Sequence, residues 1–158
     1  MNPVYAHLLV NHLPVIGTLF GLLLLGLTLL YRGERGLLRA TALVLMVSAL
    51  GGVAAQVTGE EAEELVEDRP DVPHDVIEAH EDGSKPALVM TLLAAVIGVG
   101  LVVWQTRRGS LPAAGLPALA LVTLVAFGLM ARMGQTGGQI IRPELRAPSA
   151  APVLPAPG

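Results

Sequence analysis

The sequence contains no cysteine. This absence excludes disulfide bonds, thiolate metal centres, iron–sulfur clusters and covalently attached c-type haem. A metal ion or a haem could be held only by histidine, methionine, carboxylate or amide groups. Aromatic residues make up only 3% of the chain, so a quinone pocket would have few rings to stack on.

Charge is also scarce. Charged residues are 15% of the 158 residues, 53% are apolar, and the mean hydropathy is +0.63, far too hydrophobic for an ordinary soluble domain. There is no phosphate-binding loop, no nucleophile paired with a base, and no stripe of basic and aromatic residues for nucleic acid. We therefore expect a membrane protein without a nucleic-acid partner, and an electron-transfer or accessory subunit more than a stand-alone enzyme.

Four long apolar runs are present instead, over residues 5–31, 37–58, 86–106 and 113–133. Each has about 20 residues, which is enough to cross a bilayer once. The start of the chain lacks the features of a removable signal peptide, and no internal repeat is evident. The pattern predicts an all-α, integral membrane, up-down-up-down four-helix bundle over residues 1–141, followed by a proline-rich tail over 142–158.

The charges that exist are segregated. The connections over residues 32–39 and 107–112 are short and basic, whereas residues 60–85 carry eleven of the thirteen acidic residues. Because basic loops stay in the cytoplasm, both termini and the acidic connection are expected outside. We predict a multi-pass protein of a bacterial inner membrane, whose partners are the lipid bilayer and other subunits of a redox complex.

The acidic connection is expected to hold some helix. Residues 60–68 favour a continuation of the second helix, and residues 74–81 favour a short outer helix that starts after Pro73. Residues 82–86, Asp-Gly-Ser-Lys-Pro, are predicted to interrupt the helical structure before the third membrane helix, with Ser84 as the candidate N-cap of that helix.

All four histidines fall on the predicted outer side. His7 and His12 open the first helix, and polar groups in a membrane helix are costly enough to indicate a functional site. The two lie five residues apart, about 140° around a helix, so they cannot bind one small metal ion from the same face. Asn11 shares the side of His7. The outer ends of the second and fourth helices are polar too: Gln56, Thr58, Arg132, Gln135 and Thr136.

This convergence predicts a b-type haem at the outer mouth of the bundle. One axial ligand would be His12 or His7, and its partner would be His80, with His74 as the second candidate. The haem propionates would need cations near the outer surface, and the candidates are Lys85, Arg132 and Arg142.

The same landmarks resemble a known family. His7-Leu-Leu-Val-Asn-His12-Leu-Pro14 resembles the opening His-Pro-x-x-Val-His-Phe-Pro of a widespread family of predicted bacterial four-helix membrane proteins. Thr58-Gly59, His80 and Thr136-Gly137-Gly138-Gln-Ile-Ile141 resemble its later landmarks in the same order. The resemblance implies b-type haem binding and membrane electron transfer, with His7, His12 and His80 as site candidates. The chain departs from the family in having Leu8 for proline and Leu13 for phenylalanine.

Two alternatives stay open. The chain could be a cofactor-free accessory subunit of a larger membrane enzyme, with the histidines as hydrogen-bonding groups and the tail as a strap. It could also be a metal carrier that uses His74, Glu78 and Glu81, which share roughly one helical face. Apart from Arg39 near the start of the second run, no charged residue lies within the first three apolar runs, which disfavours the carrier.

Overall fold

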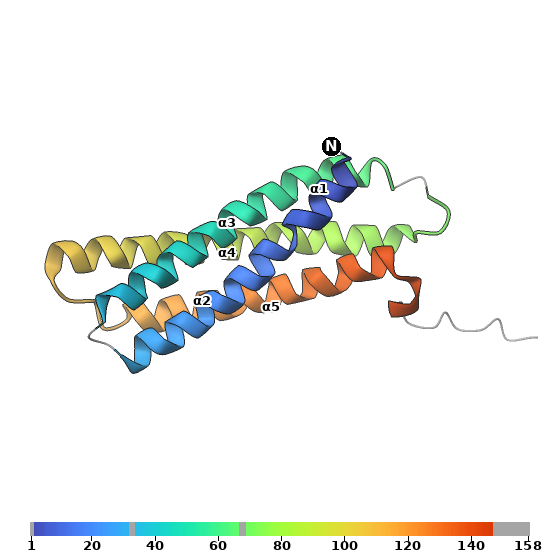
Figure 1. Ribbon diagram of the computed structural model, residues 1–158. Coiled ribbons are helices and arrows are strands. Elements are labelled where there is room, and N and C mark those ends of the chain that lie inside the picture. Colours follow the sequence, from blue (N-terminus) through green and yellow to red (C-terminus); the bar gives the residue numbers. More distant parts are fainter. Residues whose placement is uncertain (1, 32–33, 67–68, 147–158) are drawn as a thin grey trace, which may run out of the picture.

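The computed structural model describes residues 2–31, 34–66 and 69–146. These residues form five helices and a short 3-10 turn, with no strand among the described residues (Figure 1). The elements are α1 (Pro3–Val10), α2 (His12–Leu30), α3 (Arg35–Glu63), α4 (His74–Arg108), α5 (Gly115–Ile141) and η1 (Pro143–Leu145). The prediction of an all-α fold is confirmed.

The helices form an up-down-up-down four-helix bundle (Figure 1). Helix α3 packs against α2 and α4, and α5 packs against α4 and α2, so the four long helices close a ring. Helix α1 continues the line of α2 and packs against α3. We call the end with α1, the α3–α4 connection and the end of α5 the histidine end, and the opposite one the arginine end.

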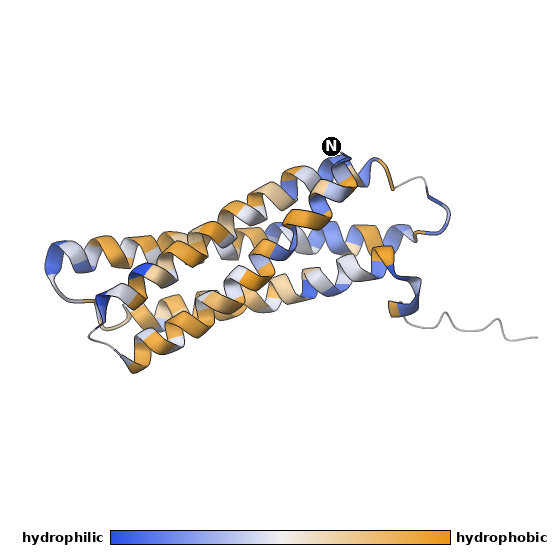
Figure 2. Cartoon of the chain, viewed as in Figure 1, coloured by the Kyte–Doolittle hydropathy of each residue, from blue (hydrophilic) through white to orange (hydrophobic). Residues whose placement is uncertain are grey.

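Four segments are long and apolar enough to cross a membrane: Pro3–Leu30, Arg35–Glu63, His74–Arg108 and Gly115–Ile141. The bundle is coloured mainly as hydrophobic along its middle and as hydrophilic toward its ends (Figure 2). The chain is thus a multi-pass membrane protein.

The interior of the bundle combines buried leucines, such as Leu25, Leu45 and Leu119, with small and polar side chains, while many other large apolar side chains face outward. Four threonines are fully buried, and each donates its hydroxyl to a carbonyl four residues earlier: Thr18, Thr41, Thr91 and Thr123. In contrast, Leu50, Val96 and Leu121 are each more than 60% exposed. Lipid is as apolar as leucine, so membrane helices associate through close packing of small residues, as they do here.

The first membrane crossing is interrupted at Asn11, between α1 and α2. The cause is Pro14, which has no N–H to offer the carbonyl of Val10 and whose ring crowds that carbonyl. The Pro14 carbonyl instead accepts bonds from the hydroxyls of Thr18, at 2.8 Å, and of Ser48 on α3, at 3.0 Å. The interruption lets α1 follow α3.

The predicted break before the third membrane helix is wrong. Residues 74–81 are helical as expected, but they are the first turns of a continuous α4 that includes Pro86. The turn before this proline is held by side chains: Lys85 pairs with Glu81 at 2.9 Å, and the Ser84 hydroxyl donates to the Glu81 carbonyl at 2.7 Å. Ser84 therefore lies inside the helix and caps nothing.

Helix α5 extends to Ile141, eight residues beyond its predicted end. Its last carbonyls are satisfied by Arg146, whose guanidinium donates to Gln139 O at 2.8 Å and to Ile140 O at 3.0 Å. Such bonds replace the partners that the end of a helix lacks. The extension brings Thr136 into the histidine end. Most of the predicted tail, residues 147–158, lies outside the described residues.

Candidate functional site

The histidine end brings two imidazoles together. The rings of His7, on α1, and His80, on α4, have centroids 6.4 Å apart and planes at 87° to each other. Both side chains are partly buried. Helices α1 and α4 belong to opposite corners of the bundle, so the two rings meet across its centre.

His7 is held by α3. Its Nδ1 lies 2.9 Å from the carbonyl oxygen of Ala55 and 3.5 Å from the hydroxyl of Thr58. The ring also faces Gly59, where an added Cβ would lie 3.2 Å from both Cε1 and Nδ1 of the imidazole. A side chain at position 59 would therefore crowd the ring.

His80 is held by α5 in the same manner. Its Nδ1 lies 2.9 Å from the hydroxyl of Thr136. The ring faces Gly137, where an added Cβ would lie 3.1 Å from the imidazole Cε1. The Thr136 hydroxyl itself donates to the α5 backbone, toward the carbonyls of Arg132, at 3.3 Å, and Met133, at 3.2 Å.

These partners assign the tautomer of both rings. Ala55 O is an acceptor only, so Nδ1 of His7 carries the proton. We assign the same tautomer to His80, because the Thr136 hydroxyl can direct its proton to the Met133 carbonyl, at 3.2 Å, and accept from Nδ1–H of His80, at 2.9 Å. Each neutral imidazole is then left with the lone pair of Nε2, the arrangement in which histidines ligate metals.

His12 and His74 do not join this pair. His12 lies on the exposed face of α2, where its Nδ1 contacts the carbonyl of Leu8 at 3.2 Å. His74 is the first residue of α4 and is exposed. Of the two histidines of the first helix that the sequence left open, the structure brings only His7 to His80.

Asn11 lies one turn deeper than His7, and its backbone N–H donates to the His7 carbonyl at 2.9 Å. Its side-chain Oδ1 is buried and accepts no hydrogen bond from the described residues. The site thus has an acceptor without a donor just below the imidazoles.

The predicted cations are at the rim. Arg132, Lys85 and Arg142 are all exposed. Lys85 pairs with Glu81, and Arg142 lies 3.5 Å from Glu144. Arg132 has no ion pair among the described residues, so it is the cation most available to an anionic group at this end.

The three-residue metal site on α4 is not supported. Within the described residues, no group of three histidine, aspartate or glutamate side chains is placed to hold a metal ion. Glu81 is engaged by Lys85, and Glu78 and His74 are exposed.

The sequence reasoning missed several groups of the site. The Ala55 carbonyl gives no signal in a sequence, and the bond from Ser84 to Gln56, at 3.1 Å between α4 and α3, depends on the unpredicted continuity of α4. The two Thr-Gly pairs, 58–59 and 136–137, were visible as family landmarks but had no assigned role.

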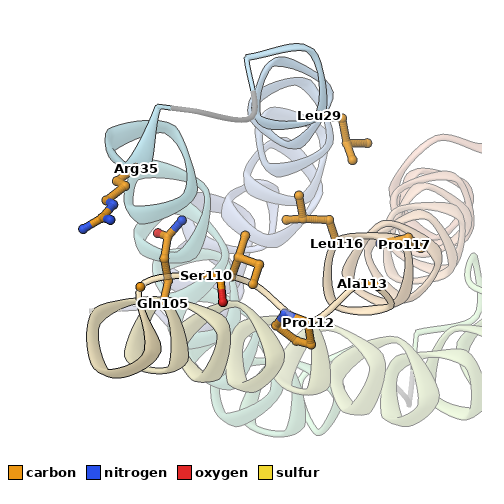
Figure 3. A pocket seen from close by; sticks show the side chains of 10 residues that line it. Leu29, Arg35, Gln105, Ser110, Pro112, Ala113, Leu116 and Pro117 are labelled. Carbon is orange, nitrogen blue, oxygen red and sulfur yellow. The ribbon is translucent and has the colours of Figure 1, made fainter.

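A cavity lies at the opposite, arginine end. It has a volume of about 430 Å³ and is lined by residues of all four long helices or their connections, including Leu29, Arg35, Gln105 and Leu116 (Figure 3). No histidine lines it. The cavity and the imidazole pair are therefore separate features.

No family model, curated protein or solved structure matches the chain. The fold and the site define it as a multi-pass membrane four-helix bundle that carries a pair of partly buried, hydrogen-bonded imidazoles at one end.

Proposed function

We propose that the chain is a small membrane cytochrome, alone or as a subunit of a redox complex, that holds one b-type haem between His7 and His80. We place this site on the periplasmic face of a bacterial inner membrane, as the charge of the loops predicts. The observation that carries the proposal is the approach of the two rings, from opposite corners of the bundle, to 6.4 Å.

The residues present fit such a group. His7 and His80 would hold the group, because two imidazoles from different helices lie with their ring centroids 6.4 Å apart and both are engaged through Nδ1. Both rings are only partly buried. When bound, the haem iron supplies a one-electron redox couple.

The protein groups have distinct roles in this proposal. The Nδ1–H bonds of His7 and His80 orient the rings and raise the basicity of Nε2. Arg132 is the cation that offsets the charge of a propionate, since it is exposed on α5 one turn before Thr136 and is free of an ion pair among the described residues.

The test is the spectrum of the purified protein after haem addition. We expect a Soret band that shifts on reduction with dithionite. His7→Ala and His80→Ala should each abolish the six-coordinate spectrum, because no other described histidine lies at the pair. His12→Ala and His74→Ala are the matched controls and should keep it. A wild-type protein that stays colourless would overturn the proposal, and so would loss of the band in His12→Ala alone.

A cofactor-free accessory subunit is the second candidate. It is favoured by the fact that both imidazoles already tie helices together: His7 joins α1 to α3 and His80 joins α4 to α5. In that case the protein stays colourless, and the two alanine variants lower its thermal unfolding midpoint. Exposed His12→Ala should leave the midpoint unchanged.

A further inference from the structure

The bundle consists of two hairpins of similar construction. The first runs from α1 to α3 and the second from α4 to α5. Each has a histidine at the start of its first helix, His7 or His80, and a Thr-Gly pair near the end of its second, at 58–59 or 136–137. In each, the Thr-Gly pair contacts the histidine of the same hairpin.

The first helices of the two hairpins are in register. His7 and His80 are 73 positions apart, and so are Thr18 and Thr91, which are both fully buried and bonded to the carbonyl four residues earlier. All the buried positions of α2 have a buried counterpart at this offset in α4: 14 and 87, 18 and 91, 21 and 94, 25 and 98, 28 and 101.

The second helices are in register as well. Thr58 and Thr136 are 78 positions apart, as are Gly59 and Gly137. Five buried positions of α3 have buried counterparts at this offset in α5: 38 and 116, 41 and 119, 45 and 123, 48 and 126, 52 and 130. Helical periodicity alone explains the spacing of the buried positions within one helix. It does not explain why histidine, threonine and the Thr-Gly pair recur at matching positions in the two hairpins.

The arrangement of the helices agrees with this correspondence. If the two hairpins are equivalent, the contact between α3 and α4 must have a counterpart between α5 and α2. Both contacts are present. The relation is an approximate two-fold axis along the bundle, the parallel type of internal repeat known in membrane proteins. His7 and His80 are equivalent under it and meet near it.

We infer that the chain is built from two equivalent hairpins and that Thr136 is a positioning residue, which holds Nδ1–H of His80 as the Ala55 carbonyl holds that of His7. Thr58 is a weaker second contact of His7, and Nε2 of both rings is left for one shared ligand. The identity of that ligand as haem rests on the proposed function. The positioning role does not, because the bonds are present in the protein itself.

The two threonines are not equally important. Thr136 is the nearest partner of His80 Nδ1, at 2.9 Å. His7 Nδ1 has the Ala55 carbonyl at 2.9 Å and Thr58 only at 3.5 Å. Removing the hydroxyl should therefore release His80 more than His7.

The experiment measures the imidazole tautomers by ¹⁵N NMR of histidine-labelled full-length protein without added haem, at a pH where the rings are neutral. In the wild type, both His7 and His80 should be Nδ1–H. Thr136→Val should shift His80 toward a tautomer mixture and leave His7 unchanged, and Thr58→Val should have a smaller effect on His7. Thr136→Ser should restore the wild-type signal.

The matched control is Thr106→Val. Thr106 lies on α4 near the arginine end and bonds the Val102 carbonyl at 2.8 Å, so it loses the same local bond without touching a histidine. If Thr136→Val is not recovered folded, Gly137→Ala replaces it, because its Cβ would push the His80 ring away from the hydroxyl. An unchanged His80 tautomer in either variant, or a change in Thr106→Val, overturns the inference.

With haem added, Thr136→Val should weaken binding by roughly 10- to 100-fold, the usual cost of losing an outer partner of a ligating histidine. The two proposals fail separately. A protein that binds no haem but shows the expected tautomers contradicts only the proposed function. A protein that binds haem, but whose His80 tautomer is unchanged in Thr136→Val, contradicts only the positioning role.

Discussion

Both ends of the bundle carry polar side chains, but at one end these side chains bond between helices and at the other end arginines point outward. At the histidine end, side chains of different helices bond one another, as His80 bonds Thr136 and Ser84 bonds Gln56. At the arginine end, Arg39, Arg107 and Arg108 are exposed, and the Arg108 guanidinium lies 5.7 Å from the centre of the Trp104 ring. Cations that reach outward fix the helices at a membrane surface. Polar groups turned inward build a site.

Glycines show the same contrast. On the histidine half, Gly51 lets helices approach, since an added Cβ would lie 2.7 Å from Cβ of Leu13. At the arginine end, Gly109 ends α4 with φ 76°, a conformation that favours glycine. One position needs space and the other needs backbone freedom.

The largest stability effect is expected from Gly51→Ala. The Leu13 Cβ cannot rotate away, so α2 and α3 must separate, at a cost of about 1–3 kcal/mol. The control is Gly128→Ala, where nothing lies within 4 Å and alanine should stabilise the helix by about 0.5–1 kcal/mol. Unfolding in detergent measures both. Equal midpoints for the two variants would show that close helix approach is not what position 51 requires.

A smaller loss is expected from Gly109→Ala, which forces a Cβ into the left-handed region at roughly 1–2 kcal/mol. Because the change is at the arginine end, ligand binding at the histidine end should be unaffected. The measurements are the unfolding midpoint and the proposed binding of added haem. Weaker haem binding with an unchanged midpoint would contradict the independence of the two ends.

The smallest effect is expected from Arg69→Gln, in the α3–α4 connection. The Arg69 side chain donates to Asp71, and this hydrogen bond lowers the pKa of that carboxyl. Both side chains are 56% exposed, so the pair adds little stability. That contribution is present at neutral pH and is lost as the pH falls through the lowered pKa. An NMR titration should show a higher Asp71 pKa in the variant, with the unfolding midpoint unchanged.

Much of this architecture could be predicted from the sequence. Apolar runs of bilayer length predicted the four crossings, and the positions of the histidines along them placed all four at one end. The position of His80 just before the third apolar run predicts it as a partner for a histidine of the first helix. The angular argument separated His7 from His12, and the structure places one inward and the other on the exposed face.

The rest depended on particular side-chain bonds, here between residues three to seven positions apart. The continuity of α4 through Pro86 rests on the Glu81–Lys85 pair and on Ser84, and the length of α5 rests on Arg146. A propensity rule counts Pro86 as a helix breaker and the glycines of α5 as a helix end, because it includes no side-chain bonds. The hairpin correspondence was hidden because its shared residues are few and its two offsets differ by five positions.

The agreement between the hairpins has a consequence for how the protein enters the membrane. Each hairpin crosses twice and returns to the side from which it departed, so the second can be inserted by the same steps as the first, without reversing its orientation. Neither half alone holds more than one of the paired imidazoles. The centre therefore forms only when the second insertion is complete, and assembly of the bundle and creation of the site are a single event.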